Sequence, residues 1–165
     1  MKGFENQIYL IAYIISNAVA LIMLVAAWKW PQIARLLFFI LFAWACWANW
    51  TTTLNSPEDY IGYANLTFSG LYKSIIHGWF SQHIQLAVGF IATCQGLIAV
   101  SMLLKGWIYR LGLIGGITFL LAIMPFGVGS AFPCTLIMAI AMAMLWKQHT
   151  WLWQHIGHKF IPKVQ

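Results

Sequence analysis

Charged side chains are scarce in this sequence, and acidic ones are nearly missing. Three residues are Asp or Glu and nine are Lys or Arg, so 7% of the chain is charged and 62% is hydrophobic. A soluble domain carries roughly 25% charged residues, which help to cover its surface. Because this chain has so few, we exclude an ordinary water-soluble domain and expect an integral membrane protein.

Several sequence features that are typical of particular functions are also absent. The three cysteines form no closely spaced pair, which argues against a metal site and a thiol oxidase. The basic residues are scattered singly, without the run or stripe that nucleic-acid binding needs. No ionisable residue lies in the middle of an apolar segment, although proton pumps and ion pathways use such residues. With no nucleophile–base pair and no phosphate loop either, the sequence favours a non-catalytic protein.

Long apolar runs predict the fold. A helix needs about 20 apolar residues to cross a bilayer, and the sequence offers five such segments, of which the last is short. We expect an all-α membrane bundle of five transmembrane helices, forming one domain over residues 1–165. The "PFGVGSAFP" stretch at 125–133 reads as a tight turn. A cleavable signal peptide ending near Ala27 is the alternative for the first span. The expected spans are 8–28, 33–50, 84–104, 107–126 and 131–146.

Most basic residues fall on one side of these spans. Cytoplasmic loops of membrane proteins are enriched in Lys and Arg. If the N-terminus is outside, Lys2, Lys73 and all acidic residues are outside as well. We therefore expect a multi-pass protein of the cell (inner) membrane with a cytoplasmic C-terminus. The basic residues expected inside are Lys29, Arg35, Lys105, Arg110, Lys147, Lys159 and Lys163.

The cytoplasmic tail, residues 147–165, is basic and aromatic. His155 and His158 can share one helix face there. No cysteine or carboxylate accompanies the two histidines, which favours an anchor at the membrane interface over a metal site.

The outer loop, residues 51–83, carries helix signals. In "SPEDY", Ser56 can cap a helix and Pro57 suits its first position. Apolar residues then recur at helical spacing in two stripes. We expect one or two amphipathic helices, which either lie on the outer membrane interface or pack as a lid over the bundle. The stripes are Tyr60, Ala64, Phe68 and Leu71, then Tyr72, Ile75, Ile76, Trp79 and Phe80.

Uncharged polar residues lie deep in the expected spans. Helical rise places Gln95 near the midplane, with Asn17 and Thr118 at nearly the same depth, as a polar midplane cluster. An unpaired amide in hydrocarbon costs several kcal/mol, so Gln95 should face inward and find a partner. The amide could join helices or face a ligand.

Small residues in the spans bear on packing. The Gly112-x-x-x-Gly116 spacing permits close helix approach, and we expect it to serve packing within the bundle rather than dimerisation. Cys46 and Cys134 come out at similar depth near the outer boundary. They could be bridged or simply packed, and the sequence leaves both open.

Three tryptophans follow one another at intervals of three in "FAWACWANW". Trp50 sits at the outer boundary, where aromatic belts are expected, and Trp44 and Trp47 lie deeper. The ladder either faces lipid or forms the wall of an outward-opening cavity, which would suit a quinone or a lipid tail. The candidate ligand-binding residues are Trp44, Trp47, Asn49 and Gln95.

From Ile33 onward the chain resembles the DoxX-like superfamily of small four-helix membrane proteins. Arg35 opens the first matching span, "SPEDYIGYA" matches an outer helix, and "GFIATCQGLIAVSMLLKG" and "YRLGLIGGITFLLAI" match the next two. Gln95 with Gly96 stands where the family has a Glu. The chain also has an extra first span and lacks the usual Gly-Lys pair. The resemblance implies an accessory or assembly factor, or a small subunit of a quinone-linked redox system.

These observations leave three hypotheses for the function. The first is an accessory or assembly factor that acts at its outer face, with membrane lipids and another membrane protein as partners. The second is a redox subunit that holds a quinone. The third is a carrier of lipids or small solutes, which the absence of broken or charged spans disfavours.

Overall fold

Five long α-helices and several short helical elements make up the computed structural model, which describes residues 7–147. No strand occurs within this range. The long helices are α1 (Gln7–Lys29), α2 (Pro31–Asn55), α5 (Ile84–Leu103), α6 (Trp107–Ile123) and α7 (Cys134–Met144). The short elements are η1 (Pro57–Gly62), α3 (Tyr63–Leu66), α4 (Gly70–Ile75), η2 (Ile76–Phe80), η3 (Met124–Ser130) and η4 (Leu145–Lys147).

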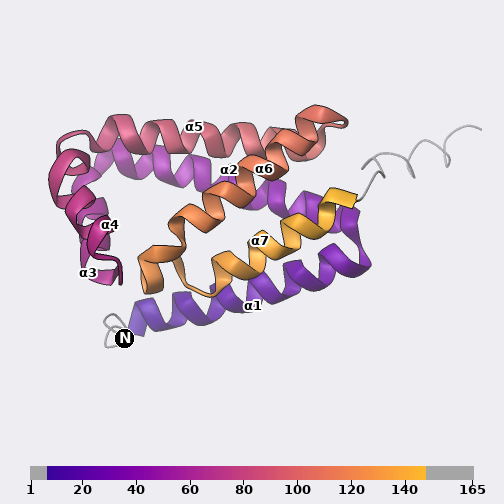
Figure 1. Cartoon of the computed structure of the whole chain (residues 1–165), viewed down its shortest axis with the longest axis horizontal. Coiled ribbons are helices and arrows are strands. Elements are labelled where there is room, and N and C mark those ends of the chain that lie inside the picture. Colours follow the sequence, from indigo (N-terminus) through magenta and orange to yellow (C-terminus); the bar gives the residue numbers. More distant parts are fainter. Residues whose placement is uncertain (1–6, 148–165) are drawn as a thin grey trace, which may run out of the picture.

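The five long helices form a closed ring. Each packs on the next in the order α1, α2, α5, α6 and α7, and α7 returns to α1. Successive helices run in opposite directions, so residues 7 and 147 lie at opposite ends (Figure 1). The short elements between residues 57 and 80 lie across one end, which we call the lid end. The opposite end, which carries Lys29, Lys105, Arg110 and Lys147, is called the basic end.

The hydrophobic core lies mainly in the half of the bundle toward the basic end. α1 enters it through Ala20, Ala26 and Ala27, whose small side chains let this helix approach α7 and α2 closely. Met23 of α1 and large side chains of the other four helices fill this core and are almost fully buried. Those of the other four helices are Phe38 and Phe42 of α2, Met102 of α5, Leu113 of α6 and Met142 of α7.

The structure is a helical membrane bundle. Four helical segments are long and apolar enough to cross a bilayer: Gln7–Lys29, Pro31–Asn55, Ile84–Leu103 and Trp107–Ser130. Large apolar side chains such as Ile22, Phe90 and Leu97 are exposed around the outside of the bundle. A solvent of lipid explains these side chains, since lipid tails are as apolar as they are.

The fifth expected span, 131–146, differs from the prediction. The apolar helical segment Cys134–Lys147 is shorter than 18 residues, and at 1.5 Å per residue it measures about 21 Å against a hydrocarbon core of about 30 Å. Length therefore does not confirm a count of five. The expected tight turn at 125–133 is only partly confirmed, because the stretch begins as the helical element η3 and turns at residues 131–133. Pro125, Pro133 and a positive φ at Gly127 keep it from continuing α6.

The outer loop was only partly predicted. α2 continues to Asn55, five residues past the expected boundary, and the two apolar stripes break into four short elements. Ser56 makes no side-chain cap, whereas Ser69 accepts the backbone N–H of Tyr72 at the start of α4. A continuous stripe cannot form because Thr67 and Ser69 have extended backbone that separates α3 from α4.

This segment packs as a lid over one end of the bundle (Figure 1). The Thr67 hydroxyl donates to the Pro125 carbonyl at 2.5 Å, and the Tyr72 hydroxyl donates to the Ala122 carbonyl at 2.6 Å. Phe68 and Leu71 remain exposed. The lid alternative is therefore confirmed, and the lid still presents apolar side chains to its surroundings.

Glycines on α6 serve packing inside the bundle, as the sequence predicted. A Cβ at Gly112 would overlap Ser101 of α5, and one at Gly116 would come within 2.5 Å of the Met142 side chain on α7.

The cysteines are free. Cys46 lies against Gly96, and the thiol of Cys134 faces the Met138 sulfur at 4.0 Å, so the two thiols have different neighbours.

Candidate functional site

Two amides join α2 to α5 inside the bundle. Asn49 Nδ2 donates to Gln95 Oε1 at 2.8 Å, and Gln95 is only 2% exposed. The expectation that Gln95 faces inward and finds a partner is confirmed. A hydrogen bond between membrane helices stabilises the bundle by about 1 kcal/mol, and this one fixes the rotation of α2 against α5.

Tyr60 extends this pair into the lid. Its hydroxyl donates to Asn49 Oδ1 at 2.8 Å, so Gln95, Asn49 and Tyr60 link α5, α2 and η1. Burial raises the pKa of the Tyr60 phenol above its ordinary value, and the neighbouring Tyr63 raises the pKa further. The phenol therefore stays protonated and keeps its role as donor. In the sequence Tyr60 belongs to an apolar stripe, and the signal for this contact is its hydroxyl, which follows Asn49 by 11 residues.

An aromatic cluster holds the lid on η3. The Tyr63 ring stacks on Tyr60 with centroids 6.2 Å apart, and it meets Phe126 edge to face at 5.7 Å. Tyr72 approaches the same Phe126 edge to face at 5.1 Å. Such pairs contribute about 0.5–1.5 kcal/mol each beyond their burial. The lid is thus anchored by ring contacts as well as by its hydrogen bonds to Pro125 and Ala122.

The tryptophan ladder points out of the bundle. Trp44 is 62% exposed and Trp47 is 65% exposed, while the Trp50 indole lies against Gly89 of α5. A Cβ at position 89 would come within 3.0 Å of that indole, so glycine is what allows the ring to lie there. Of the two alternatives for the ladder, this favours an outward face over the wall of an enclosed cavity.

A shallow groove lies beside the ladder on the outside of the bundle. It has a volume of about 320 Å³ and is open along one side. Gly89 forms part of it and Trp50 borders it from α2. Its lining residues are Trp50, Gln85, Leu86, Gly89, Phe90 and Thr93.

The four candidate ligand residues do not line one space. Trp44 and Trp47 face outward, whereas Asn49 and Gln95 lie inside and bond to each other. The reason is the angular position of each residue around the helix axis. Residues of similar depth can lie on opposite faces of a helix, and a spacing of three drifts around the helix by about 60° per step.

The expected midplane cluster of Asn17, Gln95 and Thr118 is not assembled either. Asn17 donates to the Ala131 carbonyl at 3.0 Å and to the Tyr13 carbonyl of its own helix. Thr118 is exposed on α6. Depth was predicted from helical rise, but the direction of each side chain depends on helix rotation, which the tertiary packing sets.

Arg35, expected from the sequence only as a cytoplasmic cation at the start of a span, is buried within the bundle. Its guanidinium donates to the Met102 carbonyl at 2.8 Å and to the Leu104 carbonyl, at the end of α5. It also lies 4.0 Å over the Tyr109 ring of α6. The last carbonyls of a helix are partly negative and lack helical partners, which makes them suitable acceptors for this cation.

A pattern in the sequence could have revealed Arg35. It shares helical spacing with Phe38 and Phe42, the two most buried rings of α2. Tyr109 extends the contacts of Arg35 to η4, because the Tyr109 hydroxyl donates to the Leu145 carbonyl at 3.3 Å. Arg35 and Tyr109 therefore join α2, α5, α6 and η4 at the basic end.

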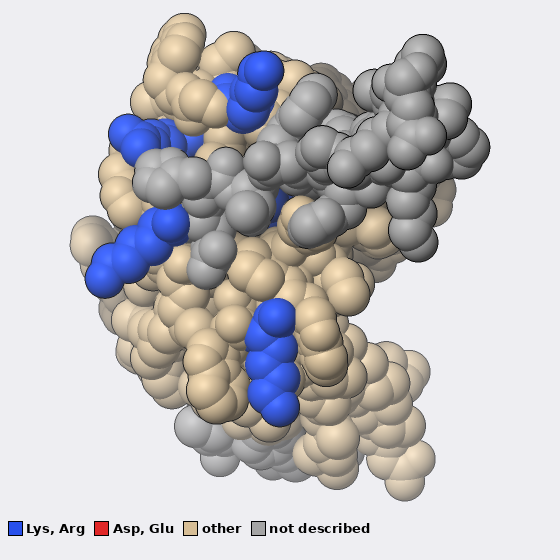
Figure 2. Space-filling model, turned by 90° about the vertical axis from the view of Figure 1, so that its right-hand side faces the viewer, with Lys and Arg blue, Asp and Glu red and all other residues tan. Residues whose placement is uncertain are grey.

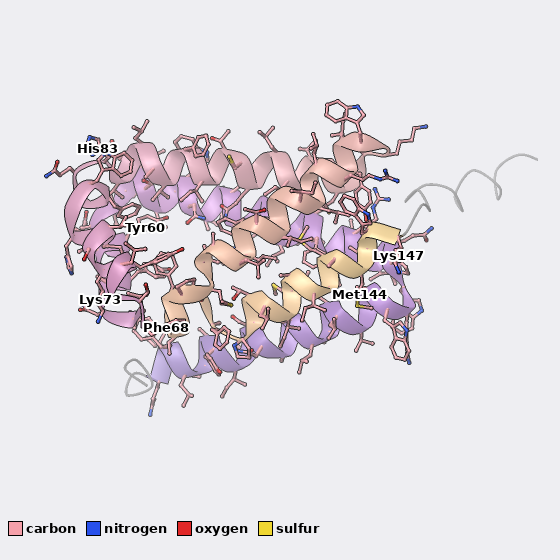
Figure 3. All side chains as sticks on the ribbon, in the orientation of Figure 1. Tyr60, Phe68, Lys73, His83, Met144 and Lys147 are labelled. Carbon is pink, nitrogen blue, oxygen red and sulfur yellow. The ribbon has the colours of Figure 1, made fainter. Side chains whose placement is uncertain are left out.

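The charges of the described residues separate to the two ends of the bundle. Glu58, Asp59 and Lys73 belong to the lid, and Figure 3 shows Lys73 and Lys147 at opposite ends. The other described cations lie toward the basic end. Viewed from that end, the surface carries blue side chains and no red ones among the described residues (Figure 2).

Within residues 7–147, no three metal-ligating side chains are placed to hold an ion together. The tail, with His155 and His158, falls almost entirely outside the described residues.

Comparisons with models of protein families, with curated proteins and with solved structures found no match.

Proposed function

We propose that this protein is a non-catalytic accessory or assembly factor, which binds another membrane protein through its lid end and the adjoining face of α2 and α5. The observation that carries the proposal is the outward direction of Trp44 and Trp47 on the same helix as Trp50, which borders the groove at Gly89. Exposed aromatic side chains beside a groove are typical anchors of protein interfaces.

The polar groups beneath this face support the same function. Asn49, Gln95 and Tyr60 are hydrogen-bonded among themselves, and Arg35 is bound to carbonyls at the other end. These groups therefore act in holding helices and lid together. Another molecule would therefore contact the shape and the apolar surface of the bundle, and such a surface suits binding of a protein rather than catalysis.

We further propose that all five long helices cross the cell (inner) membrane, with the lid end outside. The short α7 fits this topology because the lid and η3 occupy the outer layer next to it, so α7 has less depth to cross. Irregular backbone is tolerated at membrane depth where protein covers it. Apart from Lys73, the described Lys and Arg lie toward the opposite end, which favours a cytoplasmic basic end.

The resemblance to the DoxX-like superfamily remains part of this proposal. α2, α5, α6 and α7 would be the four family helices, with the lid between the first two and α1 as an addition. Gln95, at the position of the family's Glu, acts as a neutral partner of Asn49. An acid–base role at this position is therefore not part of the proposal.

Site-specific photocrosslinking in native membranes tests the interface. A photoreactive amino acid at position 44 or 47 should give one adduct of the same mass, and the same probe at Trp107, an exposed tryptophan near the basic end, should not. Trp44→Ala with Trp47→Ala should weaken partner binding by roughly 30-fold or more, because an aromatic anchor contributes about 2 kcal/mol. Adducts with lipid alone from both positions would contradict the proposal.

A quinone-binding subunit is the second candidate, and the groove is the observation that favours it. Trp50 and Phe90 offer ring faces, and Gln85 offers an exposed amide at its border, whereas the Thr93 hydroxyl donates to the Gly89 carbonyl of its own helix. Solvent extraction of protein purified from native membranes decides between the candidates. One quinone per chain, lost on Gly89→Leu, supports the redox subunit, and a crosslinked protein partner without quinone supports the accessory factor.

A further inference from the structure

The basic end combines cations with exposed indoles. Lys29 ends α1, Arg110 lies in the first turn of α6, and Lys147 ends η4, while the described carboxylates Glu58 and Asp59 belong to the lid. In the view of Figure 2, blue side chains are spread over this face. The surface therefore has a positive potential that the described residues do not neutralise locally.

Tryptophans lie beside these cations. The Lys29 ammonium is 5.7 Å from the centre of the Trp28 ring, and the Arg110 guanidinium is 5.8 Å from the Trp146 ring. Trp28, Trp146 and also Trp107 are exposed. Indole rings prefer the head-group layer of a membrane, where one part is apolar and the other is wet. They therefore hold the neighbouring cations at the depth of lipid phosphates.

We propose that the basic end is a binding surface for anionic phospholipids, whose phosphates are held by Arg110, Lys147 and Lys29. Guanidinium binds phosphate with two parallel hydrogen bonds, and ammonium acts as a mobile point charge. Each basic residue near an anionic membrane surface contributes about fivefold in affinity. The arrangement thus prefers lipids with net negative charge over zwitterionic lipids, which carry the same phosphate with a compensating cation.

The first turn of α6 strengthens this surface. Gly106 at the start of α6 provides no side-chain cap for the leading N–H groups of this helix, and nothing lies within 4 Å of where its Cβ would be. Lys105 immediately precedes this turn. The phosphate of a lipid docked here would meet both the positive helix end and the arginine fork.

Lipid titration of the full-length protein in an uncharged detergent tests this inference. Phosphatidylglycerol should raise the thermal midpoint and remain bound in native mass spectrometry, whereas phosphatidylcholine should do neither. The effect should decline with added salt, because screening weakens exposed charges. Replacing Arg110 and Lys147 by Gln together should raise the half-saturating phosphatidylglycerol concentration by roughly 20-fold or more.

Lys73→Gln is the matched control, because it removes a cation from the lid end. It should leave the lipid response unchanged. Equal responses to both lipids, an equal loss on Lys73→Gln, or an equal response to inorganic phosphate alone would overturn the inference. If the double variant does not fold, Lys29→Gln replaces it and should weaken binding about fivefold. Failure here leaves the proposed function untouched, since that concerns Trp44 and Trp47 at another face.

Discussion

At the scale of single residues, hydrogen bonds between uncharged side chains fix how this bundle is assembled. Gln95 and Asn49 are the clearest case, because Gln95 is buried, Asn49 is partly buried and each has the other as partner. Removing one amide leaves the other unsatisfied, and an unsatisfied buried donor costs about 1–3 kcal/mol. The pair is therefore more costly to break than its net hydrogen-bond energy indicates.

We expect Gln95→Leu to lower the free energy of unfolding by about 1–2 kcal/mol. Asn49 then keeps its bond from Tyr60 but loses the acceptor for its Nδ2 group. Thermal unfolding in detergent measures the loss, and Gln85→Leu, an exposed amide on the same helix, should change stability little. A double-mutant cycle with Asn49→Leu should show coupling between the two positions; strict additivity would contradict the bond.

At the scale of elements, small residues determine which helices can touch. α6 lies against α5 through Gly112, where Ser101 occupies the space that a Cβ would need. Ser101 is itself buried and its hydroxyl donates to the Ile98 carbonyl of α5, so it has little freedom to move. At Gly116 the nearest atoms are the flexible end of Met142, which can shift.

Gly112→Ala should therefore destabilise the bundle by about 1–3 kcal/mol through overpacking. Gly116→Ala should cost less, and Gly115→Ala should be close to neutral because its Cβ would lie at ordinary contact distance, 3.4 Å, from Ile98. The three variants share one helix and one kind of substitution, so thermal midpoints compare them directly. Equal losses at 112 and 115 would mean that the α5–α6 contact is not the cause.

At the scale of the whole molecule, charge separation gives the bundle two unlike ends. The lid end carries Glu58 and Asp59 with Lys73, and the basic end carries the remaining described cations. A chain with five crossings places these ends in different compartments. The proposed orientation thus depends on the helices between the two ends crossing the membrane.

Cysteine labelling tests this orientation. In a chain whose native cysteines are replaced by alanine, Lys73→Cys should react with an impermeant maleimide added to intact cells. Lys105→Cys should react only after the membrane is opened, because the proposed orientation places the basic end in the cytoplasm. Labelling of both positions from the same side would contradict both the five crossings and the orientation.

Much of the fold follows from the sequence alone. Composition and long apolar runs determine a helical membrane bundle, since only closed hydrogen bonding within a helix satisfies the backbone of an apolar chain in lipid. The boundaries of α1, α5 and α6 lie close to the predicted ones for the same reason. The glycines of α6 also indicated packing within the bundle, because a missing side chain permits close approach wherever helices meet.

The tertiary structure decided what local patterns cannot specify: the direction in which each side chain points. Helical rise placed Asn17, Gln95 and Thr118 at one depth, but helix rotation sent Asn17 to Ala131 and left Thr118 exposed. Burial of Arg35 and docking of Tyr60 on Asn49 depend on partners 67 and 11 residues away. Such contacts arise only when the ring of helices closes. The depth of a residue follows from its position along one helix, whereas the partner that its side chain meets depends on how two helices pack.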